Sequence, residues 1–140
     1  MSNLTLEDRL AIAELPVRYA RCADGPDHDG LARCLTLDAQ YDASHIPGGI
    51  VHEGREAVVA FVTAAHERLD APQHFVTNVL VEDRDTYVSC QSYVFTPLLA
   101  EGGGTFIGVK WDDQVVRTAE GWQIRRRTVQ PVWRVRAAAT

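Results

Sequence analysis

The alternation of hydrophobic and polar positions divides the chain into a helical first half and a second half made of strands. From Thr5 to Asp24, apolar residues recur three or four positions apart, as in a helix with one buried face. Thr5 and Asp8 have the spacing of a capping box at the start of this helix, and Pro16 predicts a kink or a restart within it. Asp27 can cap a short second helix, and residues 54–69 have the apolar spacing of a third. We therefore expect three helices in the N-terminal half.

Beyond residue 72 the hydrophobic period changes to two, which is the period of a strand with one buried face. This pattern predicts four long strands, at residues 73–83, 86–97, 104–117 and 121–133, after two short extended segments at 39–43 and 50–52. Helices first and long antiparallel strands afterwards indicate an α+β fold, with the helices packed on one face of a sheet. No repeat or linker interrupts the pattern, so residues 1–140 are predicted to form one domain.

Composition and charge narrow the possible partners. The chain has 140 residues, of which 46% are hydrophobic and 24% charged, as is typical of a soluble globular protein. Its net charge of −5 argues against nucleic acid and anionic membranes as partners, since both favour a basic face. The start of the chain lacks a signal-peptide pattern, and no apolar run approaches the length of a membrane span. We therefore expect a cytoplasmic protein, with Cys22, Cys34 and Cys90 as reduced thiols.

Two polar residues are candidates for catalysis. Asp24 ends the first helical pattern, and His74 begins the first long strand. A carboxylate that orients an imidazole and stabilises its charged form gives a general base that works near neutral pH. The alternative is that His74 makes one structural hydrogen bond and that Asp24 forms a turn at the helix end. Only the fold can bring these two distant residues together.

Six short segments, taken in order and spacing, resemble the SnoaL-like branch of the NTF2-like superfamily. They are YARCAD (19–24), DGLARCL (29–35), LDAQYD (37–42), GREAV (54–58), HFVTN (74–78) and GWQI (121–124). The resemblance covers essentially the whole chain. It implies a cone-shaped, curved antiparallel sheet, with the three helices closing one side and a pocket inside. Many members are homodimers or homotrimers, which implies self-association here too.

Several lyases of this superfamily resemble the chain around Asp24 and His74. They include scytalone dehydratase, the hexachlorocyclohexane dehydrochlorinase and the bile-acid 7α-dehydratase, in which an Asp and a His form a base dyad. The resemblance implies catalytic roles for Asp24 and His74, and Tyr19 resembles a pocket tyrosine of the bile-acid enzyme. Unlike scytalone dehydratase, the chain has no second histidine after His74. We expect Asp24 and His74 to lie within hydrogen-bond reach, at the floor of the largest cavity.

Further residues are predicted to bind a substrate. Strict alternation would place His74, Val76, Asn78 and Leu80 on one face, so that Asn78 could bind a carbonyl or enolate oxygen or satisfy nearby backbone groups. Aromatic residues are expected to line an apolar pocket for a ring-containing substrate, although packing in the core or at an interface is the alternative. The candidates are Tyr41, Phe61, Tyr93, Phe106 and Trp111.

The remaining histidines show no metal-type spacing. His45 and His52 flank a Pro-Gly-Gly loop that is solvated or covers the pocket, and His28 and His66 are interpreted as helix-surface residues. A metal site would need more converging ligands, so no metal is predicted. No phosphate-binding glycine loop or nucleophile elbow is present either, which favours chemistry without a cofactor.

Arg125 and Arg127 lie on one face of the last predicted strand and Arg126 on the other. An edge or interface strand is one explanation, and recognition of a carboxylate substrate is the other. Trp111, Trp122 and Trp133 alternate with charges on these last strands, which suits a sheet partly covered by another subunit. A homodimer or homotrimer is therefore expected.

The sequence thus favours a cofactor-independent proton-transfer enzyme acting on a small, apolar, cyclic metabolite. Dehydration or a related elimination, catalysed by a lyase, is the leading reaction. Isomerisation and aldol-type cyclisation, as in polyketide cyclases, use the same base and are not separated from it by sequence. An alternative from another class is a non-catalytic ligand-binding or assembly domain, because a fold does not fix a function.

Overall fold

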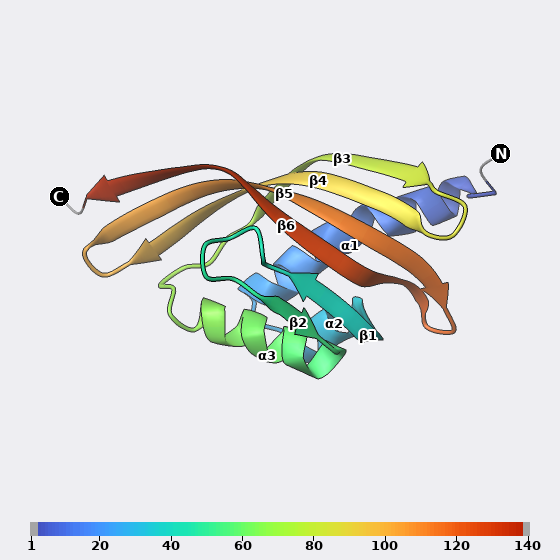
Figure 1. Ribbon diagram of the computed structural model, residues 1–140, viewed down its shortest axis with the longest axis horizontal. Coiled ribbons are helices and arrows are strands. Elements are labelled where there is room, and N and C mark those ends of the chain that lie inside the picture. The colour runs from blue at the N-terminus through green and yellow to red at the C-terminus, as the bar shows by residue number, and fades with distance from the viewer. Residues whose placement is uncertain (1–2, 139–140) are drawn as a thin grey trace.

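A computed structural model describes residues 3–138 and shows three helices against one side of a curved sheet (Figure 1). The helices are α1 (Leu6–Asp24), α2 (His28–Arg33) and α3 (Arg55–His66). The strands are β1 (Leu35–Asp42), β2 (Val51–Glu53), β3 (Phe75–Asp83), β4 (Val88–Ala100), β5 (Gly103–Thr118) and β6 (Gly121–Ala138). They form one six-stranded sheet in the order β2-β1-β6-β5-β4-β3. The predicted α+β class is confirmed.

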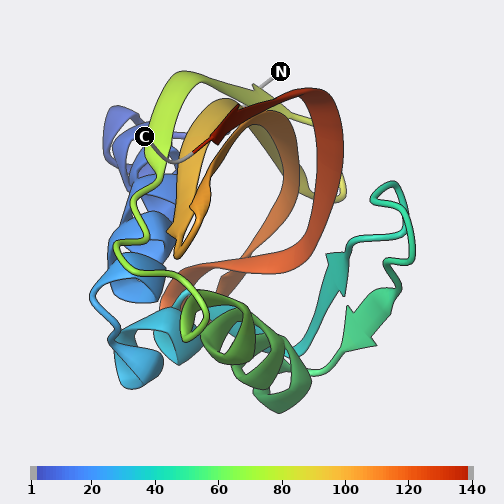
Figure 2. The same ribbon diagram turned by 90° about the vertical axis from the view of Figure 1, so that its left-hand side faces the viewer.

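The sheet curves strongly and does not close, and the helices cover its concave side (Figure 2). Neighbouring strands are antiparallel, except that β1 runs parallel to β6. This parallel pair brings the helical half of the chain onto the last strand. The last hairpins are longer than predicted, because the pairing of β4 with β5 continues to Ala100 and Gly103, and β6 pairs as far as Ala138.

Helix α1 begins at the predicted capping box. The Thr5 hydroxyl accepts from the Asp8 amide at 3.0 Å, and the Asp8 carboxylate accepts from the Thr5 amide at 3.1 Å. Of the two predicted alternatives, the restart does not occur: the helix runs unbroken through Pro16 to Asp24. A proline has no amide hydrogen, so it cannot donate to the carbonyl of Ile12, four residues earlier. The thiol of Cys90 donates to that buried carbonyl instead, at 3.6 Å, and thereby ties α1 to β4.

Strand β3 contains a bulge at Asn78. The backbone of Asn78 has a φ of 54°, a conformation that asparagine tolerates better than most residues, and the register with β4 shifts between Thr77 and Leu80. Val76 pairs with Val94 before the bulge, and Val81 pairs with Cys90 after it. The extra residue therefore reverses the alternation, so that Leu80 lies on the outer face and is 53% exposed.

The core lies between the helices and the concave face of the sheet. Its buried apolar residues come from all three helices and from strands β1, β4, β5 and β6, and include Ile12, Leu15, Tyr19, Leu31, Val58, Val62, Val94, Trp111, Ile124 and Val129. Among the residues that the structure describes, no helix combines the length and apolar character that crossing a membrane would need.

The convex face of the sheet carries a second group of aromatic side chains, here called the outer aromatic patch. Its members are Phe75, Tyr93, Phe95, Phe106 and Trp133. The Phe95 ring lies 5.8 Å from those of Phe75 and Trp133, and 6.2 Å from that of Phe106. The Trp133 indole covers Gly108, where a Cβ atom would lie 2.3 Å from the ring.

Candidate functional site

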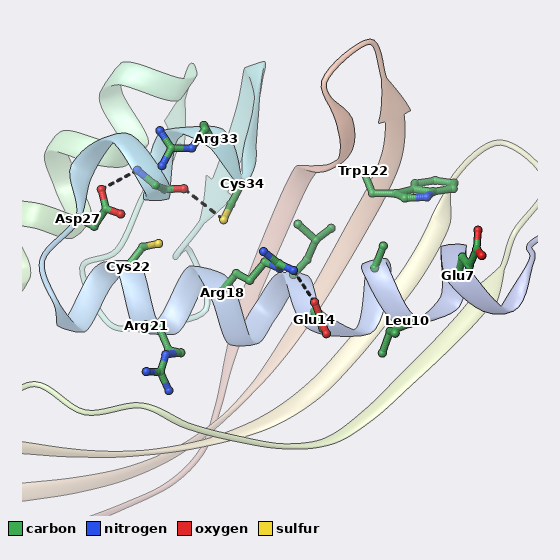
Figure 3. Close-up of a pocket in the computed structure, with 13 residues that line it drawn as sticks. Glu7, Leu10, Glu14, Arg18, Arg21, Cys22, Asp27, Arg33, Cys34 and Trp122 are labelled. Atoms are coloured by element: carbon green, nitrogen blue, oxygen red, sulfur yellow. Dashed lines mark hydrogen bonds and ion pairs between the residues drawn. The ribbon is translucent and has the colours of Figure 1, made fainter.

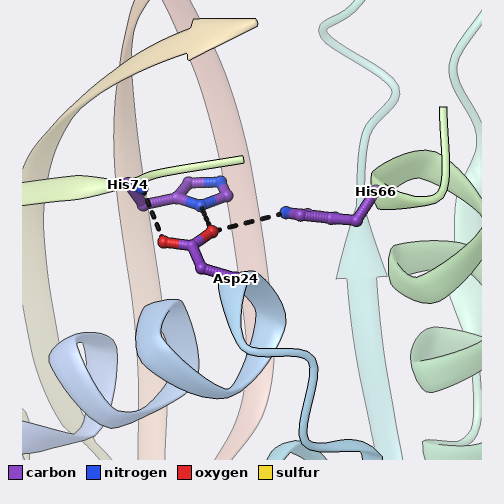
Figure 4. Close-up of side chains that lie close together, drawn as sticks. All are labelled: Asp24, His66 and His74. Carbon is purple, nitrogen blue, oxygen red and sulfur yellow. Dashed lines mark hydrogen bonds and ion pairs between the residues drawn. The ribbon is translucent and has the colours of Figure 1, made fainter. Parts of the chain in front are cut away.

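The last residue of α1 and the residue before β3 meet through two hydrogen bonds (Figure 4). His74 Nδ1 lies 2.6 Å from Asp24 Oδ1, and the His74 amide donates to Asp24 Oδ2 at 2.7 Å. One carboxylate therefore fixes both the ring and the backbone of His74. The predicted contact between Asp24 and His74 is present.

The charge on Asp24 decides which nitrogen of His74 carries a proton. Burial alone would raise the pKa of Asp24, but the hydrogen bonds from the side chain and backbone of His74 outweigh it and lower that pKa. An ionised carboxylate only accepts hydrogen bonds, so Nδ1 must carry the proton that lies between the two groups. In the neutral ring Nε2 is then the basic atom. The side chains of His74 and Asp24 are 13% and 18% exposed, so solvent reaches them from the surface.

His66, the last residue of α3, is a third member of this cluster. Its Nε2 lies 3.8 Å from Asp24 Oδ1, and its ring centroid lies 5.2 Å from that of His74 (Figure 4). The interpretation as a helix-surface residue was wrong, since the side chain is only 14% exposed and burial lowers its pKa. The sequence held a signal for this position, because His66 continues the four-residue spacing of the buried Val58 and Val62.

The rings of Trp111 and Tyr19 connect His74 to α1 through aromatic contacts. The Trp111 centroid lies 5.6 Å from the ring of His74 and 5.6 Å from that of Tyr19. Tyr19 is buried, and its hydroxyl has no hydrogen-bond partner among the described residues. Burial raises the pKa of Tyr19, so the hydroxyl keeps its proton and is an available donor.

A buried arginine packs against both of these rings. The guanidinium carbon of Arg127 is 3.9 Å from the Tyr19 centroid and 3.7 Å from the Trp111 centroid. Burial alone would lower the pKa of Arg127, but the carboxylate of Asp113 more than offsets this and raises it. Arg127 therefore stays charged, and its Nη1 has no partner among the described residues. The edge-strand explanation was wrong, because β6 lies between β1 and β5.

Of the predicted substrate-binding aromatic residues, three lie on the helix side of the sheet. Trp111 contacts His74, as described above, and Tyr41 lies 5.4 Å from Phe61 between centroids. His52, at the end of the predicted extended segment 50–52, belongs to β2, and its ring stacks on Phe61 at 3.9 Å. Burial raises the pKa of Tyr41.

One protein-family model matches the chain over most of its length. Residues 4–128 match the model of the SnoaL-like domain. The chain belongs to the SnoaL-like family. The resemblance inferred from the six short segments is thereby confirmed, including its NTF2-like fold.

Relatives of this SnoaL-like chain share its length and fold. An uncharacterised protein of Mycobacterium tuberculosis is 33% identical over 132 residues, which cover 91% of this chain and 87% of the relative. A Novosphingobium aromaticivorans structure, provisionally named an aromatic ring hydroxylase, is 26% identical with a TM-score of 0.85, covering 98% of this chain and 96% of that one. A hexachlorocyclohexane dehydrochlorinase of Novosphingobium barchaimii is 19% identical with a TM-score of 0.82, covering 97% of each chain. This last likeness is one of fold.

Three of the residues predicted to bind a substrate, two aromatic and one polar, do not face the pair of Asp24 and His74 in this SnoaL-like domain. Tyr93 is 56% exposed on the outer aromatic patch, and Phe106 stacks on Phe95 there. The register explains this, because the neighbouring pair of Ser92 with Trp111 takes the inner face. Asn78 is exposed at the bulge and does not share the face of His74, contrary to prediction.

The dyad does not line the hollow of about 670 Å³ that lies between α1, α2 and Trp122 (Figure 3). That hollow is bordered by residues on the outer side of α1, among them Leu10, Arg18, Cys22 and Arg33. The prediction that the dyad lies at the floor of the largest cavity is not borne out there. Asp24 and His74 lie instead beside the rings of Trp111 and His66.

Proposed function

We propose that this SnoaL-like protein is a cofactor-independent lyase of the dehydratase type, acting on a small, apolar, cyclic metabolite. His74 is the general base, Asp24 orients it and stabilises its charged form, and Tyr19 donates a hydrogen bond to the leaving group. The observation that carries this proposal is the 2.6 Å contact between Asp24 and His74 Nδ1, which leaves Nε2 as the basic atom. A base of this kind contributes about 10²–10⁴-fold to a rate.

The reaction follows from these positions. Nε2 removes a proton from a carbon next to an activating group, and the electron pair of that bond forms a double bond to the neighbouring carbon. The leaving group departs from that second carbon with its own bonding pair. The imidazolium that forms is stabilised by the negative charge of Asp24. A leaving hydroxide accepts a proton from the imidazolium and leaves as water, which restores the base.

The surroundings support this chemistry. The unpaired hydroxyl of Tyr19 and the unpaired Nη1 of Arg127 are buried donors near Trp111, and such donors stabilise a developing negative charge. We assign contact with the substrate ring to Trp111, Tyr41 and Phe61. Isomerisation or cyclisation would begin with the same proton abstraction and differ only in the fate of the carbanion.

We also propose that the protein is a cytoplasmic homodimer or homotrimer assembled through the outer aromatic patch. Trp133 is 46% and Tyr93 56% exposed there, and an interface of aromatic residues is a common way to cover such a face. Cys22, Cys34 and Cys90 are all free thiols, which suits a reducing compartment. Trp111, part of the sequence argument for assembly, is buried and takes no part.

Proton abstraction can be tested without knowing the product. A panel of cyclic ketones and β-hydroxy ketones is incubated with the protein in D₂O and a chelator, and exchange at the α-carbon is followed by NMR. We expect exchange with the wild type, a loss of about 10²–10⁴-fold in His74→Gln, and a large loss in Asp24→Asn. The control His28→Gln, at an exposed helix position, should exchange as the wild type does.

Two outcomes would count against the proposal. Exchange at the wild-type rate in His74→Gln would show that another group is the base. Binding of ring compounds with no exchange in any of them would favour the alternative, a non-catalytic ligand-binding domain.

A further inference from the structure

The orientation of His66 leaves a lone pair facing a carboxylate. Its Nδ1 lies 2.8 Å from the carbonyl oxygen of Val62, and a carbonyl only accepts, so Nδ1 carries the proton. Nε2 of the neutral ring is then an acceptor. It is buried, has no partner among the described residues, and points toward Asp24 Oδ1 at 3.8 Å. Two acceptors that face each other are repulsive unless a positive charge lies between them.

The same carboxylate also faces the second imidazole. One oxygen of Asp24, one nitrogen of His66 and one nitrogen of His74 all lie within 4.8 Å of one another. Two imidazoles and one carboxylate are a ligand set that Zn²⁺ and neighbouring divalent transition metals favour. With bonds of about 2.0 Å, tetrahedral ligands stand about 3.3 Å apart. The 2.6 Å contact of Asp24 with His74 would have to open, and the 3.8 Å separation from His66 would have to close.

The surroundings of the cluster favour a cation. The hydrogen bond from His66 Nδ1 to the Val62 carbonyl is the kind of outer contact that fixes the tautomer of a metal-bound histidine. Asp24 lies at the C-terminal end of the 19-residue helix α1, where the helix dipole is negative. Arg127, which also contacts Trp111, already pairs with another carboxylate, that of Asp113.

We propose that Asp24, His66 and His74 form a binding site for one divalent transition-metal ion of the Zn²⁺ class. The metal binds His74 through Nδ1, and the proton of that atom moves to Nε2, so the ring stays neutral. Nε2 then carries a hydrogen and cannot remove a proton from a substrate. The cluster is therefore either a base or a metal site, and metal binding inhibits the reaction. Only this inhibition rests on the proposed function; the binding itself does not.

Binding is tested with Co²⁺ as the probe, because its visible absorption reports the number and geometry of its ligands. Protein stripped with a chelator is titrated with Co²⁺ and then with Zn²⁺ as the competitor. We expect one equivalent of four-coordinate Co²⁺, displaced by Zn²⁺, and binding at least about tenfold weaker in His66→Gln and in Asp24→Asn. The matched control His52→Gln, whose ring stacks on Phe61 away from Asp24, should bind as the wild type does.

The variants are checked for folding by circular dichroism and urea unfolding, and two separate substitutions guard against one that fails to fold. Failure of the wild type to bind Co²⁺, or equal binding by a folded His66→Gln variant, would overturn the proposal. The exchange assay in D₂O provides a second readout, as zinc inhibition relative to the metal-free rate of each variant. Inhibition that persists unchanged in His66→Gln would also overturn it. A wild type that binds Co²⁺ but catalyses no exchange would uphold the metal site and reject the lyase.

Discussion

Arg127 and Asp113 face each other directly across strands β5 and β6 and form a bidentate ion pair, with two nitrogen–oxygen distances of 2.7 Å. The two residues are 1% and 0% exposed. Because the guanidinium contacts the rings of both Tyr19 and Trp111, this one side chain joins α1, β5 and β6. The pair therefore supports the position of the helix that ends in Asp24.

Breaking this pair should destabilise the fold strongly. Asp113→Asn leaves a buried cation without its counter-charge, and Arg127→Lys loses both the bidentate contact and the stacking, so each should lower the free energy of unfolding by about 3–5 kcal/mol. Unfolding in guanidinium chloride measures this. The control Arg134→Lys, at an exposed position of the same strand, should cost less than about 1 kcal/mol. A small loss of unfolding free energy in both Asp113→Asn and Arg127→Lys would mean that the pair does not hold α1, β5 and β6 together.

The contact between Cys90 and the Ile12 carbonyl should depend on Pro16. Cys90→Val removes the donor and leaves a buried carbonyl unpaired, at a cost of about 1–3 kcal/mol, whereas Cys90→Ser keeps a donor there. Pro16→Ala restores the backbone donor, so Cys90→Val should cost less in that background. A double-mutant cycle by urea unfolding gives the coupling. Strict additivity would show that the thiol does not replace the missing amide.

Asp42 should make the stability of the fold depend on pH in the acidic range. Its carboxylate accepts from the Ser44 hydroxyl at 2.6 Å, from the Ser44 amide at 3.0 Å and from Arg126 at 2.6 Å, and these contacts lower its pKa. The folded pKa lies below the unfolded value of about 3.9, so this stabilisation is complete above that pH and is lost as the pH falls through the folded value. Asp42→Asn should therefore lose less stability than the wild type between pH 5 and pH 3, measured by urea midpoints, whereas the exposed control Asp38→Asn should follow the wild type. Equal slopes in Asp42→Asn and the wild type would contradict this.

Local patterns were enough to predict much of the fold. The capping box, the three helices, the four long strands and the contact of Asp24 with His74 all follow from spacing or family resemblance. The parts that sequence did not predict depend on tertiary structure. The parallel pairing of β1 with β6 buries Arg127, and a bulge moves Asn78 away from His74. His66 was missed because a single histidine at a helix end has no partner until α3 packs beside α1.

Self-association should depend on the outer aromatic patch. Trp133→Glu places a charge beside Phe95 on that face and should shift the protein toward monomer, measured by light scattering over a range of concentrations. Leu10→Glu, at a 63% exposed site on α1, is the matched control and should leave the mass unchanged. A wild type that is a monomer at every concentration would remove the assembly proposal.

Ligand binding should distinguish the two aromatic groups. Phe61→Ala removes a ring that contacts Tyr41 and His52, and we expect it to weaken the binding of cyclic ketones at least about tenfold, since a lost ring costs roughly 1.5–3 kcal/mol of apolar contact. Phe106→Ala, on the convex face, should bind them as the wild type does. NMR titration measures both affinities, and the reverse ranking would place the ligand on the outer face.

The bulge at Asn78 divides β3 into two halves of opposite phase. His74 and Val76 face the helices before it, and Val79 and Val81 face them after it. A one-residue deletion there would restore a single phase, and a chain that kept its second half on the core would turn His74 outward. In evolutionary terms, the gain or loss of one codon in β3 could convert a scaffold that only holds a ligand into one that presents a base to it, with no change to either residue of the dyad.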